Sequence, residues 1–104
     1  CLHVIAEDMQ GIPIGAGRIT DNGKVGRIAV IGEWRGNGVG TAIMNELHRQ
    51  AEQGGIWYTY LHSQSSSAEF YMRLGYRVEG DEFLEAEIPH LKMVRSGHRN
   101  GLAR

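Results

Sequence analysis

The 104-residue chain has little cysteine, little proline and no long apolar run. Its one cysteine, Cys1, excludes an internal disulfide and a zinc site built on cysteines. The longest purely apolar run, Ile28–Ile31, is far shorter than the ~20 residues of a membrane-spanning helix. We therefore expect no membrane partner. A single cysteine also fits a reducing compartment, and we expect a cytoplasmic protein.

Neither sign of charge dominates the chain, because 11 Lys and Arg stand against 12 Asp and Glu. Proteins that bind nucleic acid usually carry a clear excess of basic residues, so no nucleic-acid partner is predicted. The aromatic residues on and near one predicted strand lack a basic cluster, so we interpret them as sheet-packing residues rather than a platform for bases. These residues are Trp34, Trp57, Tyr58 and Tyr60.

Histidine is the remaining common metal ligand in the chain. The five histidines show no ligand spacing such as H-x-x-x-H, and no metal is predicted. They are His3, His48, His62, His90 and His98.

The length fits one domain, and 41% apolar with 22% charged residues is the balance of an ordinary globular chain. Alternating patterns predict strands at Leu2–Glu7, Pro13–Thr20, Lys24–Ile31, Ile56–His62, Tyr76–Val78 and Ile88–Val94. The element order is βββαβαββ. It predicts a mixed α/β (α+β) fold whose central, mostly antiparallel sheet is flanked by helices.

Turn and helix signals fill in the connections between these strands. Asp21-Asn22-Gly23 predicts a hairpin with a type I′ turn. An amphipathic helix with Ile43, Met44, Leu47 and Ala51 on its apolar face follows residue 40 and stops at Gly54-Gly55. This strand–helix–strand unit implies a parallel neighbour in the sheet. Ser66 and Glu69 have capping-box spacing for a short helix over Ser67–Leu74.

The glycine-rich segment Arg35–Thr41 lies between a predicted strand and the main helix. Glycines let the backbone approach a ligand closely, and the start of a helix points free N–H groups and a positive dipole end at it. A phosphate or pyrophosphate is the expected guest. The P-loop pattern fails because no lysine stands before Thr41, and the dinucleotide pattern fails because Thr41 occupies its last glycine position.

The spacing Arg35-x-x-Gly38-x-Gly40 resembles the pyrophosphate-binding motif of GNAT-superfamily N-acetyltransferases. The stretch from Gly26 to Thr41 is similar to that family's signature almost position by position, and Ser67–Tyr76 is similar to its second block. Glu87-Ile-Pro-His-Leu-Lys-Met93 resembles the ElaA-like bacterial branch. The resemblance covers about residues 2–94, which would form the acetyl-CoA-binding domain, with 95–104 as a polar tail.

The resemblance implies transfer of an acetyl group from acetyl-CoA to an amine, with no metal. Backbone groups of the strand before the loop would contact the pantetheine arm, and the loop would wrap the pyrophosphate. Arg35 either adds charge there or only buttresses the loop. The cofactor-binding residues implied are Ile28, Ala29, Val30, Arg35, Gly36, Asn37, Gly38, Val39, Gly40, Thr41 and Gln64.

Tyr71 falls on the family's general-acid position, where it would donate to the leaving thiolate; the alternative is that it only packs beside Phe70. The general base stays open. Thr59 stands where many family members have a glutamate, and Glu33, His62, His90 or an ordered water are the candidates. The acceptor would be a small-molecule or peptide amine.

Two further interpretations stay open. The chain could instead be a catalytically weak, regulatory acyl-CoA-binding module, or a nucleotide-binding domain. The family's usual order begins with a strand and helices before the first hairpin, and this chain starts at that hairpin. We therefore expect a trimmed product of a longer protein, or a homo-oligomer such as a homodimer that covers the open sheet.

Overall fold

The computed structural model describes residues 1–97 of the chain. The first sheet is built from β1 (Leu2–Glu7), β2 (Pro13–Ile19) and β3 (Val25–Val30). The 3₁₀ helix η1 (Gly32–Trp34) leads to the long helix α1 (Val39–Gln53) and then to β4 (Tyr58–Gln64). The remaining elements are η2 (Ser65–Ser67), α2 (Ala68–Met72), β5 (Arg77–Val78), β6 (Phe83–Glu85) and β7 (Ile88–Ser96).

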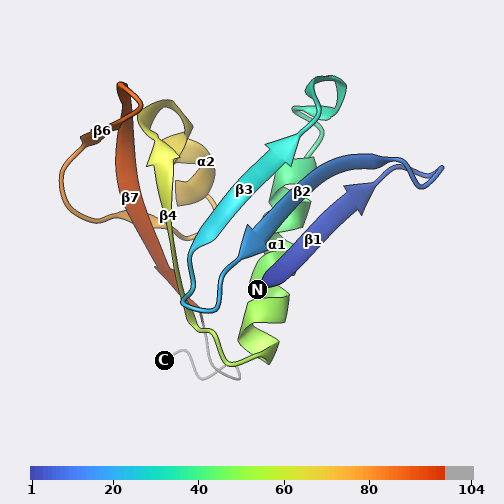
Figure 1. Cartoon of the computed structure of the whole chain (residues 1–104), viewed down its shortest axis with the longest axis horizontal. Helices are drawn as coiled ribbons and strands as arrows, with labels where there is room; N and C mark the ends of the chain where they lie inside the picture. Colours follow the sequence, from blue (N-terminus) through green and yellow to red (C-terminus); the bar gives the residue numbers. More distant parts are fainter. Residues whose placement is uncertain (98–104) are drawn as a thin grey trace.

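The strands form two antiparallel groups rather than one continuous sheet (Figure 1). The first has the order β1-β2-β3, and the second has the order β4-β7-β5, with β6 paired to the end of β7. One parallel bridge, Lys24 to Tyr60, joins the groups at the start of β3. The mixed α/β class is confirmed. The predicted parallel pairing of β4 with a neighbouring strand is limited to this one bridge, because β3 and β4 diverge beyond it.

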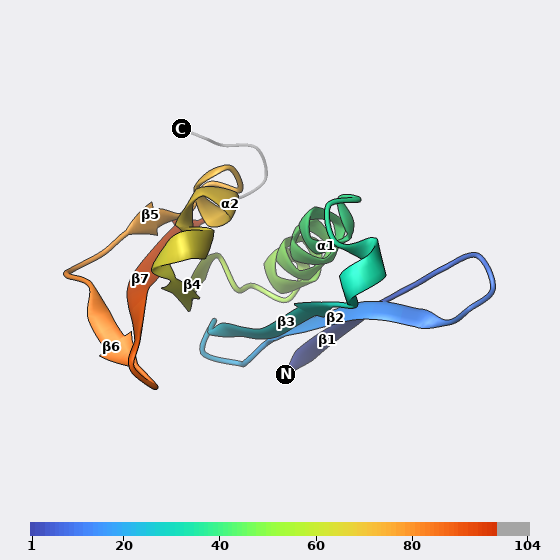
Figure 2. The same cartoon turned by 90° about the horizontal axis from the view of Figure 1, so that it is seen from above.

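Helix α1 covers one face of the first group, as the view from above shows (Figure 2). Its predicted apolar face is confirmed, since Ile43, Met44, Leu47 and Ala51 are all buried there. Gly17 on β2 makes the close approach possible, because a Cβ there would lie 3.0 Å from Ile43 Cγ2 and 3.1 Å from Leu47 Cδ1 on the helix. The helix ends as predicted, with Gly54 as the cap and Gly55 in the left-handed conformation at φ 86°.

The opposite face of β1–β3 carries exposed apolar side chains. Ile5 is 62% exposed and Ile31 44% exposed, and both line a shallow apolar groove of about 320 Å³ with Pro13 and Ile14. Within residues 1–97, β1 pairs only with β2, which leaves its outer edge open. That another segment or a second copy covers this surface stays a prediction.

The second half of the chain differs from the prediction in two elements. Strand β6 was not predicted; its three residues and the Ala86-Glu87 turn contain no glycine, asparagine or proline to signal a hairpin. Helix α2 is shorter than Ser67–Leu74 because Ser65–Ser67 forms a 3₁₀ turn instead. The capping box is wrong, since no side-chain hydrogen bond caps this helix.

The end of the last strand and the type of the β2–β3 turn also differ from the prediction. The last strand continues to Ser96, so residues 95 and 96 belong to the sheet and not to the polar tail. Residues 98–104 of that tail, with His98, lie outside the described part of the chain. The hairpin after β2 is not a type I′ turn, because Gly23 has φ 92° but Asn22 does not have a positive φ. The amide of Gly23 donates to the Thr20 carbonyl, as in a three-residue loop.

A buried polar chain ties α1 to the second group of strands. His48 Nε2 lies 2.8 Å from the Tyr76 hydroxyl oxygen, and the Thr59 hydroxyl lies 2.9 Å from the same atom. Burial, with the Arg95 charge as a smaller cause, lowers the pKa of His48 to about 4. His48 is therefore neutral in the folded protein at pH 7.

This pKa makes stability depend on pH in a defined direction. Between pH 6.5 and pH 4 the unfolded chain takes up a proton on His48 that the folded chain does not, so stability falls as pH falls. We expect His48 to account for a loss of about 2–3 kcal/mol between pH 7 and pH 4.5. Urea unfolding at pH 7 and at pH 4.5 measures this loss in the free energy of unfolding. In His48→Gln, which keeps a partner for Tyr76 but does not titrate, the loss should shrink by that amount; an equal loss in both proteins would contradict the assignment.

Candidate functional site

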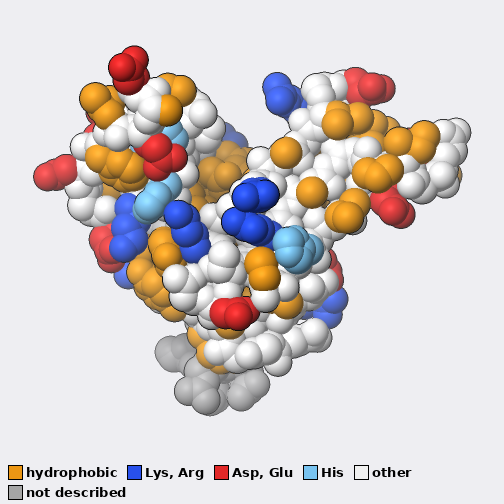
Figure 3. Space-filling model, in the orientation of Figure 1, with side chains coloured by type: hydrophobic (Ala, Val, Ile, Leu, Met, Phe, Trp, Pro, Cys, Tyr) orange, Lys and Arg blue, Asp and Glu red, His pale blue; other side chains and the backbone are white. Residues whose placement is uncertain are grey.

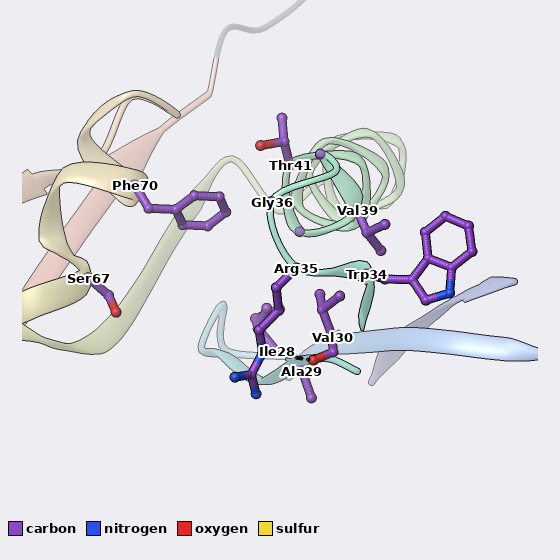
Figure 4. Close-up of a pocket in the computed structure, with 12 residues that line it drawn as sticks. Ile28, Ala29, Val30, Trp34, Arg35, Gly36, Val39, Thr41, Ser67 and Phe70 are labelled. Carbon is purple, nitrogen blue, oxygen red and sulfur yellow. Dashed lines mark hydrogen bonds between the residues drawn. The ribbon is translucent and has the colours of Figure 1, made fainter. Parts of the chain in front are cut away.

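A cavity of about 610 Å³ opens where β3 separates from the second group of strands. Its walls are the end of β3, the glycine-rich loop, the first turn of α1, and residues of η2 and α2. Figure 4 shows Ser67 and Phe70 on one side and the loop with Thr41 on the other, above Ile28, Ala29 and Val30. The notch between the two lobes is visible on the surface in Figure 3.

A second cavity, of about 630 Å³, adjoins the first. The two share Ile28, Arg35 and Ser67 as lining residues, so they form one continuous cleft between β3 and β4. The second cavity is the more polar, with Ser63, Gln64, Tyr71, His62 and His90 in its walls. The cleft can therefore hold a long ligand with chemically different ends.

The backbone explains why the cleft opens on the β3 side. Ala29 pairs with Ala16 and Gly26 with Arg18, so Arg27 and Ile28 together face Gly17 in a β-bulge. Arg27 takes the left-handed conformation at φ 56°, which bends β3 at the second cavity. Within residues 1–97, β4 pairs only with β7 apart from the Lys24 bridge, so among these residues the edge of β4 toward β3 has free N–H and C=O groups.

The loop before α1 provides backbone donors for an anion. Gly36 and Gly38 have φ of 82° and 81°, a conformation that favours glycine. The first helix bond runs from the Ala42 amide to the Gly38 carbonyl, so the amides of Val39, Gly40 and Thr41 have no helix acceptor. No acidic side chain lies in this first turn to neutralise the positive end of the helix.

Arg35 is anchored to the strand before the loop. Its Nε donates to the Val30 carbonyl at 3.2 Å, the bond drawn in Figure 4. The residue lines both cavities, with its guanidinium directed toward β3. The bond gives Arg35 a buttressing role, and its charge still lies at the junction of the two cavities.

Tyr71 stands in the second cavity on helix α2. Its ring packs edge-on against Phe70, with centroids 4.9 Å apart, and against Tyr76 at 5.9 Å. Burial raises the pKa of Tyr71, so its hydroxyl stays protonated at neutral pH. Tyr71 therefore both packs against two aromatic rings and lines the second cavity, and its hydroxyl is neutral.

The structure brings together ten of the eleven predicted cofactor-binding residues; Asn37 does not line either cavity. The prediction missed Ser67 and Phe70, which line the first cavity from the opposite wall. A Cβ on Gly40 would lie 3.3 Å from Phe70 Cζ, so this glycine lets the ring approach the helix. Trp34 also lines the cavity, although its indole points away from the other lining residues (Figure 4).

Only some of the candidate general bases line the cleft. Thr59 is buried in the polar chain with Tyr76, and neither Thr59 nor Glu33 lines the cleft. His62 and His90 both line the second cavity. Sequence patterns missed Glu85, which lies 3.7 Å from His62 Nδ1 and 3.9 Å from His90 Nε2. Because the strand that carries Glu85 was not predicted, no signal placed it there.

In the part of the chain that the structure describes, no three His, Cys, Asp or Glu residues are arranged to hold a metal ion. Among residues 1–97, no helix is long and apolar enough to cross a membrane.

The fold is a mixed α/β domain in which a cleft of two adjoining cavities lies beside a glycine-rich loop. The family model described as an acetyltransferase (GNAT) domain matches residues 2–96. The uncharacterized N-acetyltransferase YjcF of Bacillus subtilis (strain 168) is 41% identical over 97 residues, covering 89% of this chain and 69% of YjcF. The chain belongs to the GNAT acetyltransferase family.

Solved structures agree on the fold. An acyl-CoA N-acyltransferase from Pseudomonas aeruginosa is similar with a TM-score of 0.80 and 27% identity, over 90% of this chain and 67% of that one. Escherichia coli ElaA is similar with a TM-score of 0.80 and 23% identity, over 90% of this chain and 67% of ElaA. The chain spans 66% of the length of one Bacillus subtilis relative and 69% of two others.

Proposed function

We propose that the chain is the catalytic part of an N-acetyltransferase that moves an acetyl group from acetyl-CoA to an amine. The observation that supports it best is the continuous cleft, with backbone donors for an anion in one cavity and Tyr71 in the wall of the other. Family membership and the names of the similar proteins support the same reaction class.

Acetyl-CoA fits the donors that the cleft presents. The free amides of Val39, Gly40 and Thr41 would hold the pyrophosphate, as helix N-termini hold phosphates. The amide groups of the pantetheine arm would pair with backbone groups of Ile28–Val30 on β3 and with the open edge of β4. This arrangement would place the thioester toward the second cavity.

The residues of the second cavity match the needs of acyl transfer to nitrogen. A lysine-like amine with a pKa of ~10.4 is mostly protonated at pH 7, and its neutral form costs about 4–5 kcal/mol. A proton acceptor beside the thioester lowers this barrier. On the thioester side, the neutral Tyr71 hydroxyl would donate a hydrogen bond to the departing thiolate, whose negative charge develops as the C–S bond breaks.

A second candidate function is a regulatory module that binds acyl-CoA but transfers it weakly. The observation in its favour is Thr59, which stands in a buried hydrogen-bonded chain where many family members have a glutamate. This module would bind acetyl-CoA through the same cleft, so binding alone does not separate the two functions.

Release of the coenzyme A thiol distinguishes the acetyltransferase from the regulatory module. We expect acetyl-CoA plus a panel of primary amines, covering polyamines, amino sugars, lysine derivatives and peptide α-amines, to release coenzyme A faster than acetyl-CoA alone. Free coenzyme A should compete and ATP should not, because the dinucleotide and P-loop patterns are missing from residues 35–41. Tight binding without amine-dependent release would support the regulatory module instead.

A further inference from the structure

The hairpin β6–β7 places one carboxylate between two imidazoles at the second cavity. Phe83 pairs with His90 and Glu85 with Ile88, so Phe83 and Glu85 lie on the same face of β6. The Glu85 oxygens lie 3.7 Å from His62 Nδ1 and 3.9 Å from His90 Nε2. Phe83 stacks on His90 at 6.0 Å and meets His62 edge-on at 5.3 Å.

The backbone of this hairpin holds an unfavourable conformation. Both residues of its two-residue turn have positive φ, 51° at Ala86 and 65° at Glu87, although neither is glycine. Residues other than glycine rarely adopt this region, and they keep it where the surrounding structure imposes it, often near a functional site. Here the turn brings Glu85 back beside His90.

One hydrogen bond fixes the tautomer of His90. Its Nδ1 lies 2.7 Å from the Ile88 carbonyl oxygen, and a carbonyl can only accept, so Nδ1 carries the hydrogen. In the neutral ring Nε2 is then the basic atom, and it is the atom that faces Glu85. Within residues 1–97 no hydrogen bond fixes the tautomer of His62 in this way.

We propose that His90 Nε2 is the general base of the transfer and that Glu85 is a positioning residue that stabilises the imidazolium formed there. The proposal rests on the proposed function and names the group that it left open. The titratable and charged residues that share the second cavity or contact His90 are Arg27, Arg35, His62, Tyr71 and Glu85.

The proton balance of the step is complete with these groups. The amine nitrogen forms a bond to the acetyl carbon, and the C–S bond of the thioester breaks. A proton leaves nitrogen for His90 Nε2, while the Tyr71 hydroxyl donates a hydrogen bond to the departing thiolate. His90 then releases its proton to solvent and the thiolate takes one proton from solvent, so one amide and one thiol form from one amine and one thioester.

A pH series of kcat/KM with acetyl-CoA and a lysine-derived amine tests the proposal in the full chain. We expect His90→Gln to lower kcat/KM by about 10²–10³-fold at pH 7, and the deficit to shrink near pH 9.5, where much more of the amine is already neutral. Glu85→Gln should lower kcat with little change in KM, because it removes a carboxylate that acts on the imidazolium, and this cation forms only as the proton is transferred. A deficit that does not change with pH, no deficit, or a larger one in His62→Gln would overturn it.

A second readout does not depend on turnover. Imidazole ¹⁵N NMR at pH 8 should show His90 with hydrogen on Nδ1 and none on Nε2, and the same state in Glu85→Gln. Hydrogen on Nε2 would refute the proposal even if the enzyme is active. If the protein transfers acetyl to no amine, the proposed function fails, and the NMR result still decides whether His90 has the geometry of a base.

Discussion

Gly38→Val should weaken acetyl-CoA binding by about 100-fold or more. A side chain at Gly38 would stand in the first cavity, beside the free amides of Val39 and Gly40. Hydrogen bonds to a charged group contribute about 1.5–3 kcal/mol each, so losing one or two of them accounts for a change of this size. Isothermal titration calorimetry with acetyl-CoA measures the affinity directly.

The control must carry the same backbone strain. Gly38 and Gly11 both have φ 81°, and a Cβ at either glycine meets no atom within 4 Å. Valine at each position should therefore cost similar stability, about 1–2 kcal/mol for the left-handed conformation. Gly11 lies in the β1–β2 turn, away from both cavities of the cleft.

We thus expect Gly11→Val to bind acetyl-CoA like the unchanged protein, with thermal unfolding lowered to the same degree as in Gly38→Val. Equal loss of binding in both variants would mean that strain alone caused it. Unchanged affinity in Gly38→Val would remove the glycine loop from the binding site.

Tyr71→Phe should lower kcat by about 10²–10⁴-fold with little effect on acetyl-CoA binding. The change keeps the ring, and with it the edge-on contacts to Phe70 and Tyr76. It removes the hydroxyl of a residue that lines the second cavity. A group that acts on charge developed only in the transition state affects kcat rather than ground-state binding.

Tyr58→Phe is the matched control for the loss of a hydroxyl. Tyr58 is 44% exposed on β4 and lines neither cavity of the cleft. Steady-state thiol release should be unchanged in this variant. Full turnover in Tyr71→Phe would show that Tyr71 only packs in the core.

The sequence was sufficient to predict the loop and the helix that follows it. Their signals are local: Gly36 and Gly38 stand where positive φ is needed, and the apolar residues of α1 recur at helical spacing. The C-terminal end of α1 followed from Gly54-Gly55 for the same reason, whereas the helix begins at Val39, earlier than the predicted start after residue 40. Local patterns also placed Tyr71 on a short helix, although only the family resemblance gave it a chemical role.

Features that depend on distant contacts were not predictable in this way. The bulge at Arg27 and the divergence of β3 from β4 arise from pairing between strands, and no local composition marks them; only the family resemblance implies a bulged strand that splays from its neighbour before the loop. Strand β6 is three residues long and ends in a turn without glycine, so the position of Glu85 beside His90 was hidden. The buried contact of His48 with Tyr76 joins residues 28 positions apart.

Amide mapping by ¹⁵N NMR with acetyl-CoA tests the central claim most directly. We predict that saturating acetyl-CoA shifts the amide signals of Gly38–Thr41 in the loop and helix start and of Ile28–Val30 on β3, and that ATP at the same concentration does not reproduce the pattern. We expect these shifts because the amides of Val39–Thr41 have no helix acceptor and because Ile28–Val30 line the cleft. No shift at either segment, or shifts confined to the exposed face of β1 and β2, would contradict an acetyl-CoA site between β3 and β4.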